Sequence, residues 1–183
     1  MKISPAESYK RWRHTRGYGV HSPFAYMLVK EVVRPGSDYA WYAYTDVDNA
    51  MADRVARRYR RQARILLRLA ARLAVESAFI PQNVSGPFRA ALLGADSRMH
   101  IVTAMAEIDR CRLIGTIGDY IPLETLTMLM ARPSRILVFL NVPDGWRESL
   151  FGAVDEGLMF YSRRNVIVIN RPGMQKVAYS VSI

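Results

Sequence analysis

The residues best placed to do chemistry lie in a loop near the middle of the chain. A short apolar run, Ala78–Ile80, is followed by the polar loop Pro81–Pro87 and then by a helical pattern over Phe88–Leu93. A strand, a loop and a helix in this order aim backbone amides and a helix N-terminus at a phosphate or a nucleotide. The pattern therefore predicts a cradle for a nucleotide-type cofactor. Its candidate contact residues are Gln82, Ser85 and Gly86.

The sequence gives no sign of other reactive arrangements. Its three histidines are too far apart along the chain to form a pair with metal-ligand spacing. It has neither the Gly-x-x-x-x-Gly-Lys phosphate loop nor the Gly-x-Ser-x-Gly elbow of hydrolases. The single cysteine, Cys111, has no neighbouring base, and free cysteines are most often buried packing residues. We therefore expect no metal site and no covalent nucleophile.

The elements that would position the loop alternate between strands and helices. Apolar patterns predict strands at residues 78–80, 101–105, 112–115, 136–140, 166–169 and 177–183, with helices at 88–93, 122–130 and 146 to about 160. The run Ile136–Leu140 has five consecutive apolar residues, which is typical of a central strand buried on both faces. The predicted fold is α/β, a Rossmann-like and mostly parallel sheet with an antiparallel C-terminal strand.

An N-terminal helical arm, residues 1–46, is predicted to precede the α/β domain of residues 47–183. Gly17 and Gly19 allow a tight turn, and Ser22 followed by Pro23 is a typical helix start. That helix is expected to end near Val33. The aromatic segment at residues 39–44 fits either packing under the arm, which we favour, or a base-stacking platform.

A long helix from about Val47 to Leu73 carries arginines along one face and apolar side chains along another. The arginines that recur every three or four residues are Arg57, Arg61, Arg64, Arg68 and Arg72. They form either the solvated face of a packed amphipathic helix, which we favour, or a surface for weak contact with nucleic acid or another polyanion.

The bulk composition limits the class of protein. The chain has 183 residues and a net charge of +10, which favours contact with polyanions without specifying a reaction. No apolar run approaches the roughly 20 residues of a membrane span. The first residues lack the apolar core of a secretory signal, and a single cysteine fits a reducing compartment. We therefore expect a cytoplasmic protein without a membrane partner.

Several segments together resemble one family. They are GYGVHSPFAYMLV (Gly17–Val29), DYAWYAYTDVD (Asp38–Asp48), ARRYRRQARILLRLAARL (Ala56–Leu73), RILVFLNVPDGW (Arg135–Trp146) and the closing strand KVAYSVSI (Lys176–Ile183). In these segments the chain resembles a bacterial branch of the class I S-adenosylmethionine-dependent methyltransferases. The resemblance implies a methyltransferase sheet with S-adenosylmethionine as cofactor. It adds Met105, Asp119 and Asn141, at later strand ends, to the candidate contacts of that cofactor.

Three departures from the family pattern bear on activity. Active relatives carry a glycine-rich loop after the first strand, but here Gly86 alone remains between two prolines. Met105 stands where relatives have the acid that holds the ribose, and Asn141 stands where they have an aspartate. These departures predict a methyltransferase-fold protein that has lost normal cofactor binding and catalysis and serves as an interaction module.

Two alternatives remain open from the sequence. One is an active methyltransferase in which backbone contacts in an atypical loop replace the missing side chains. The other is a basic nucleic-acid-binding module that uses the arginine face. The apolar side of the N-terminal arm is also compatible with a homodimer.

Overall fold

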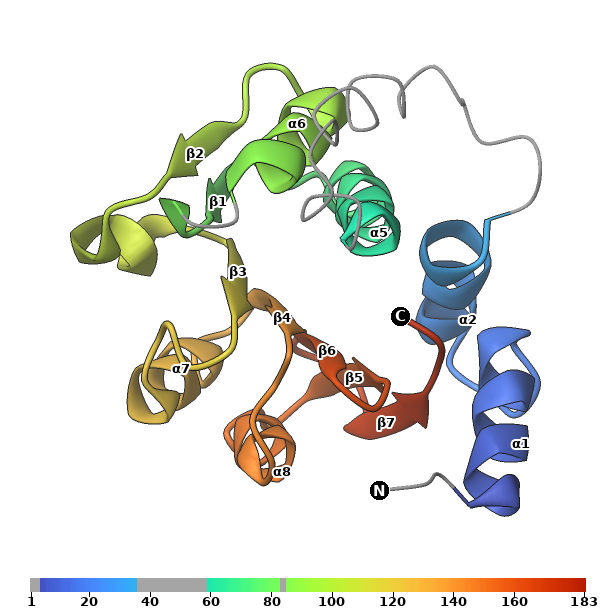
Figure 1. Cartoon of the computed structure of the whole chain (residues 1–183). Helices are drawn as coiled ribbons and strands as arrows, with labels where there is room; N and C mark the ends of the chain where they lie inside the picture. The colour runs from blue at the N-terminus through green and yellow to red at the C-terminus, as the bar shows by residue number, and fades with distance from the viewer. Residues whose placement is uncertain (1–3, 36–58, 83–84) are drawn as a thin grey trace.

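The computed structural model describes residues 4–35, 59–82 and 85–183 (Figure 1). The predicted aromatic segment 39–44, the predicted domain boundary at residues 46–47 and Arg57 lie outside these ranges. The helical elements are α1 (Pro5–Thr15), α2 (Pro23–Leu28), the π-helical turn η1 (Val29–Val33), α5 (Arg60–Arg72), α6 (Ser85–Ala95), the 3-10 turn η3 (Met105–Arg110), α7 (Leu123–Met130) and α8 (Trp146–Gly152). The strands are β1 (Ser77–Phe79), β2 (His100–Val102), β3 (Leu113–Ile117), β4 (Ile136–Leu140), β5 (Gly157–Tyr161), β6 (Asn165–Asn170) and β7 (Val177–Ser180).

The strands form one seven-stranded sheet in the order β2-β1-β3-β4-β6-β5-β7. Strand β6 pairs antiparallel with both of its neighbours, β4 and β5, whereas the other neighbouring strands pair in parallel. The predicted mostly parallel α/β sheet is therefore confirmed. Its antiparallel member lies in the C-terminal part, as expected, but it is β6 rather than the last strand.

The sheet separates two layers of helices, so the core has two halves. One half packs beneath α5 and α6 and the other beneath α7 and α8, and Figure 1 shows these pairs on opposite faces of the sheet. Strand β4 contributes to both: Val138 faces the first half, while Leu137 and Phe139 face the second. The expectation that this strand is buried on both faces is confirmed.

The N-terminal arm folds back onto the same domain. Gly17 and Gly19 have positive φ values of 89° and 76° and turn the chain between α1 and α2. The Ser22 hydroxyl accepts a hydrogen bond from the amide of Ala25 at 3.3 Å, which confirms the predicted helix start. The buried side chains of α2 and η1 join the core cluster that also holds α5.

One predicted element is wrong. The helix expected from Trp146 to about residue 160 ends at Gly152, and strand β5 occupies Gly157–Tyr161. Gly157 has a φ of 144°, which ends any helical continuation and places the next residues in the sheet. The apolar run after Gly157 fits a helix and a buried strand equally well, which explains the error.

Smaller differences occur at the N-terminus and at β2. Helix α1 was not predicted, although the Ser4 hydroxyl accepts the amide of Glu7 at 3.2 Å in the manner of a helix cap. Strand β2 ends at Val102, so Met105 begins the turn η3 instead of closing the strand. Within the described ranges, no helix is both long and apolar enough to cross a lipid bilayer.

Candidate functional site

The residues predicted to contact a cofactor come from several strand ends on one edge of the sheet. Gln82 follows β1, and Asp119 follows β3; both are exposed. Met105, after β2, is also exposed. Because β2, β1 and β3 are parallel neighbours, their carboxyl ends lie side by side. These residues therefore share one edge of the sheet.

The loop after β1 leads directly into helix α6. Ser85 is the first residue of that helix, and Gly86 lies in its first turn. A Cβ atom added at Gly86 would meet no atom within 4 Å, so the fold itself does not require glycine there. The part of the loop at residues 83–84 lies outside the described ranges.

Asn141 occupies a different place from the other candidates. It follows β4 with a φ of 51°, a left-handed conformation that asparagine tolerates better than most residues. Its backbone amide donates to Oδ1 of Asn165 at 3.4 Å, and its Nδ2 donates to the hydroxyl of Tyr59 at 3.4 Å. Asn141 therefore ties the end of β4 to the β5–β6 hairpin and to the start of α5.

A cavity of about 820 Å³ opens beside Asn141. Its walls are the loop after β4, the start of α8, the tip of the β5–β6 hairpin, the start of α5 and helix α1. We call it the hairpin pocket; its polar and charged lining residues are Glu7, Arg11, Tyr59, Gln62, Asn141, Asp144, Arg147, Glu148, Ser162, Arg163, Arg164 and Asn165. Its volume is within the range of small-molecule sites.

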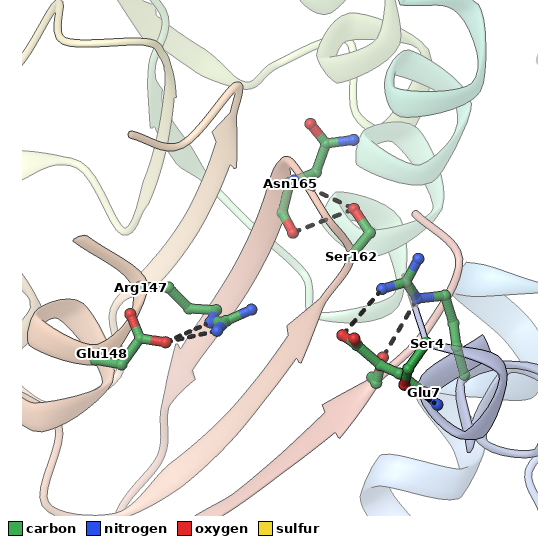
Figure 2. Close-up of polar contacts among 8 residues, drawn as sticks. Ser4, Glu7, Arg147, Glu148, Ser162 and Asn165 are labelled. Atoms are coloured by element: carbon green, nitrogen blue, oxygen red, sulfur yellow. Dashed lines mark hydrogen bonds and ion pairs between the residues drawn. The ribbon is translucent and has the colours of Figure 1, made fainter. Parts of the chain in front are cut away.

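The hairpin tip is fixed by its own hydrogen bonds. The Ser162 hydroxyl accepts the amide of Asn165 at 3.2 Å, and Nδ2 of Asn165 donates to the carbonyl of Ile183 at 3.0 Å. The amide of Val142 donates to the carbonyl of Arg164 at 2.8 Å, which joins the hairpin to the loop after β4. Figure 2 shows Ser162 and Asn165 between Arg147 with Glu148 on one side and Glu7 on the other. The backbone that presents Arg163 and Arg164 is thus anchored.

Some of the charges in the hairpin pocket are paired. Arg11 lies 3.6 Å from Glu7, and Arg147 lies 2.5 Å from Glu148. The hydrogen bond from Arg147 also lowers the pKa of Glu148, so this carboxylate stays charged at neutral pH. These two pairs cancel their own charge within the pocket.

Among the described residues, three charged side chains of the pocket form no hydrogen bond or ion pair: Asp144, Arg163 and Arg164. Both arginines are exposed at the hairpin tip. On the opposite wall, Oε1 of Gln62 is buried and finds no partner within the described ranges. The pocket therefore offers two guanidinium groups without a partner in the described part of the protein, which suit a ligand with an anionic head.

Arg163 and Arg164 are not among the residues predicted from the sequence, because the helix predicted up to residue 160 left no hairpin at this place. The signal was present as Ser162-Arg163-Arg164-Asn165, a polar tetrapeptide between two apolar runs. Such a pattern is typical of a hairpin turn.

The predicted arginine face of α5 points largely at the arm and the C-terminus. Nε of Arg68 donates to the carbonyl of Val32 at 2.7 Å, and this arginine is only 5% exposed. Arg72 lies 2.6 Å from Glu31 of η1, and Nη2 of Arg61 donates to the carbonyl of Ser182 at 2.7 Å. Arg64 also has an interaction of its own. On this face, Arg68 and Arg72 hold the arm to the domain, and Arg61 bonds the C-terminal segment. Contact of this face with a polyanion stays a prediction.

Cys111 is buried at the end of η3, and its thiol donates to the carbonyl of Glu107 at 3.7 Å. Burial raises the pKa of the thiol to about 11 from an ordinary value of 9.0. Thiolate is the reactive form, so Cys111 is poorly suited to act as a nucleophile near neutral pH. Among the described residues, no group of three metal-ligating side chains is placed to hold an ion.

We expect Cys111 to react slowly with a thiol-specific chromogenic disulfide in the native protein at pH 8, and rapidly after unfolding in urea. Because the folded pKa is raised, the thiol contributes stability that is constant below about pH 9 and declines as the pH rises toward about 11. Rates of labelling and urea midpoints measured over this pH range check both statements. Native labelling as fast as in urea would contradict the buried position.

Comparison of the chain with protein-family models, with curated proteins and with solved structures finds no match. Function is therefore argued from the geometry and chemistry of the residues themselves.

Proposed function

We propose that this chain is a methyltransferase-fold protein, diverged from S-adenosylmethionine-dependent methyltransferases, that has lost normal cofactor binding and catalysis. Its working site is the hairpin pocket, which binds a ligand with an anionic group. The observation that carries the proposal is the position of the hairpin pocket. Of the six residues expected to contact a cofactor, Asn141 lines this pocket, and the other five are not among its lining residues.

The ancestry rests on the resemblance of the sequence, and the coarse fold is compatible with it. A mostly parallel seven-stranded sheet with helices on both faces and an antiparallel strand near the C-terminus is what that resemblance implies. A fold alone does not fix an activity. The proposed loss of cofactor binding therefore depends on the side chains that follow the carboxyl ends of the strands.

The loss of cofactor binding is supported by the side chains at those ends. Strand β2 ends at Val102, and the exposed thioether of Met105, in the turn η3 that follows, stands where the resemblance implies a ribose-binding carboxylate. A thioether is a weak acceptor and cannot replace the two strong bonds that a carboxylate accepts from ribose hydroxyls. Pro81, at the start of the loop after β1, has no amide hydrogen to offer a ligand.

The anionic ligand is supported by the guanidinium groups of Arg163 and Arg164. A guanidinium binds phosphate or carboxylate through paired, charge-assisted hydrogen bonds, which are about twice as strong as neutral ones. The nearby Asp144 is a single carboxylate against these two cations, so a positive charge remains after the local pairs are counted. The amides of Gln62 and Asn141 can bond polar atoms next to the anionic group.

Isothermal titration calorimetry with S-adenosylmethionine and with S-adenosylhomocysteine tests the loss of cofactor binding. We expect dissociation constants no tighter than about 1 mM, equivalent to about −4 kcal/mol. Micromolar binding would contradict the proposal and favour an active methyltransferase. In that case Ser85→Trp shows whether the loop at Pro81–Pro87 forms the site, because an indole at the start of α6 should then abolish the affinity.

Pyrophosphate is expected to stabilise the folded protein through the hairpin pocket. At about ten times its dissociation constant it should add about 1.4 kcal/mol, or roughly 3–6 °C in melting temperature. The double variant Arg163→Ala/Arg164→Ala should weaken binding at least about tenfold, because each charge-assisted bond contributes about 1.5–3 kcal/mol. Thermal melting at several pyrophosphate concentrations measures both.

The matched control is Arg89→Ala/Arg98→Ala, which removes the same charge from exposed positions outside the pocket. This control should keep the wild-type response to pyrophosphate. Equal losses in the two double variants would mean that net charge alone attracts the anion, and the pocket would then not be a site.

A further inference from the structure

A row of three aromatic rings is exposed along the N-terminal helix. Tyr9 and Trp12 of α1 and Tyr18, which follows it, are 61%, 46% and 59% exposed. The rings of Tyr9 and Trp12 are stacked with centroids 5.9 Å apart and planes inclined by 16°. Trp12 and Tyr18 are stacked with centroids 6.5 Å apart and planes inclined by 22°. We call these three residues the aromatic row.

The aromatic row is not part of the core. Helix α1 has no buried residue, and other side chains hold it to the body of the protein. Nε of Arg11 donates to the hydroxyl of Ser180 at 3.3 Å, and the amide of Ser182 donates to Oγ1 of Thr15 at 2.9 Å. Packing in the core therefore does not explain why three large rings are exposed to solvent. Exposed aromatic clusters of this kind commonly mark binding surfaces.

Cations accompany the rings. The guanidinium of Arg16 lies 4.4 Å from the centroid of the Trp12 ring, and that of Arg13 lies 6.0 Å from the centroid of Tyr9. Lys10 is exposed on the same helix. Residues 1–16 contain five lysines and arginines and one acid, Glu7, which pairs with Arg11.

The cations of this helix also act on His14. Its pKa is lowered, first by partial burial and then by the charge of Lys10, with Arg13 adding to the effect. A base is hard to protonate where positive charge already gathers, so the neighbourhood favours an anion.

We propose that the aromatic row, together with Lys10, Arg13 and Arg16, binds single-stranded nucleic acid. Unpaired bases stack on the rings, and the three cations contact the phosphates. Parallel rings beside a positive surface are the combination that sequence-tolerant single-strand binders use. A duplex keeps its base faces stacked internally, so it offers the row only its phosphates.

The composition of α1 argues against a lipid surface as the occupant. Interfacial helices bury an apolar face that is rich in leucine, phenylalanine or tryptophan. Of these residues the sequence PAESYKRWRHT contains Trp12 alone, and it has no leucine, isoleucine, valine or phenylalanine. A row of flat, polar-edged rings suits bases better than acyl chains.

This surface is separate from the hairpin pocket. Glu7 and Arg11 of α1 line the pocket, whereas the residues of the aromatic row do not. The inference therefore stands or falls independently of the proposed function.

Fluorescence anisotropy with a labelled oligothymidine of about ten nucleotides, a length within known site sizes, tests the proposal. We expect binding whose affinity falls with salt at a slope near −2 in log–log form, as for about three released counterions. Trp12→Ala should weaken binding about tenfold, as for the loss of one stacked base, and Trp12→Phe should restore most of it. Tyr120→Ala, an exposed tyrosine elsewhere on the surface, is the matched control and should bind as the wild type does.

Three results would overturn the proposal. The first is an affinity that Trp12→Ala leaves unchanged, and the second is a duplex of the same length that binds as tightly as the single strand. The third is co-sedimentation with phosphatidylserine vesicles without binding to the oligothymidine. Circular dichroism of Trp12→Ala should match the wild type, because the exposed side chain makes no core contact.

Discussion

Replacing Gly157 by alanine is expected to destabilise the folded protein strongly. Gly157 opens β5 opposite Asn170 of β6, with a φ of 144° that side chains rarely adopt. A Cβ atom there would lie 2.0 Å from the carbonyl oxygen of Ile169 and 3.1 Å from the amide nitrogen of Arg171. Both are backbone atoms of the paired strand, so no side-chain rotation relieves the clash.

We expect Gly157→Ala to lose more than about 4 kcal/mol of unfolding free energy, a large share of the 5–15 kcal/mol typical of a domain. Urea unfolding followed by circular dichroism measures the loss. The control is Gly152→Ala at the end of α8, where an added Cβ meets no atom within 4 Å. That variant should stay within about 1 kcal/mol of the wild type. A Gly157→Ala protein as stable as this control would contradict the pairing of β5 with β6.

The second large loss of stability is expected on replacing Arg68, which ties the N-terminal arm to the domain. Its guanidinium is almost fully buried and donates to the carbonyl of Val32 at the end of the arm. Arg68→Ala removes a charge-assisted hydrogen bond and leaves both a void and a buried carbonyl without its donor. Together these should destabilise the protein by about 3 kcal/mol.

Arg68→Met separates the contribution of the hydrogen bond from that of the filled volume. Methionine refills most of the volume but cannot donate to Val32, so we expect a loss of about 1–2 kcal/mol. Arg89→Ala, on the exposed side of α6, controls for charge and should cost less than about 0.5 kcal/mol. Hydrogen exchange at the amides of Val32 and Val33 should quicken in Arg68→Ala. Unchanged exchange and stability would mean that the arm is held by apolar packing alone.

The sequence predicts well those elements whose signals are local. Ser22 and Pro23 define a helix start by cap chemistry alone, and the run Ile136–Leu140 defines a strand by its length and continuous apolarity. Both predictions are confirmed because neither depends on what lies across the fold.

Prediction fails where distant packing decides the structure. Leu158, Met159 and Phe160 are compatible with a helix until the pairing with β6 selects a strand. Arg68 has the spacing of a surface residue, yet the arm covers it, and no local pattern reveals that cover.

The hairpin pocket could not be assembled from the sequence for the same reason. Its lining comes from four separate segments of the chain, and Asn141 meets Tyr59 only because α5 packs beside the carboxyl end of β4. Cofactor motifs follow one strand end and are visible in sequence, whereas a pocket between a hairpin and three helices is not. Five of the six predicted candidates therefore follow the first three strands, and Asn141, after β4, is the one that lines the pocket.

The central claim is that ligands enter at the hairpin pocket and not at the loop after β1. A titration followed by two-dimensional amide NMR tests it most directly, with S-adenosylhomocysteine and pyrophosphate added in turn. We predict that pyrophosphate shifts the amides of residues 141–148 and 162–166, and that S-adenosylhomocysteine leaves Gln82, Gly86, Met105 and Asp119 unmoved. Saturable shifts of those four amides with S-adenosylhomocysteine would contradict the claim.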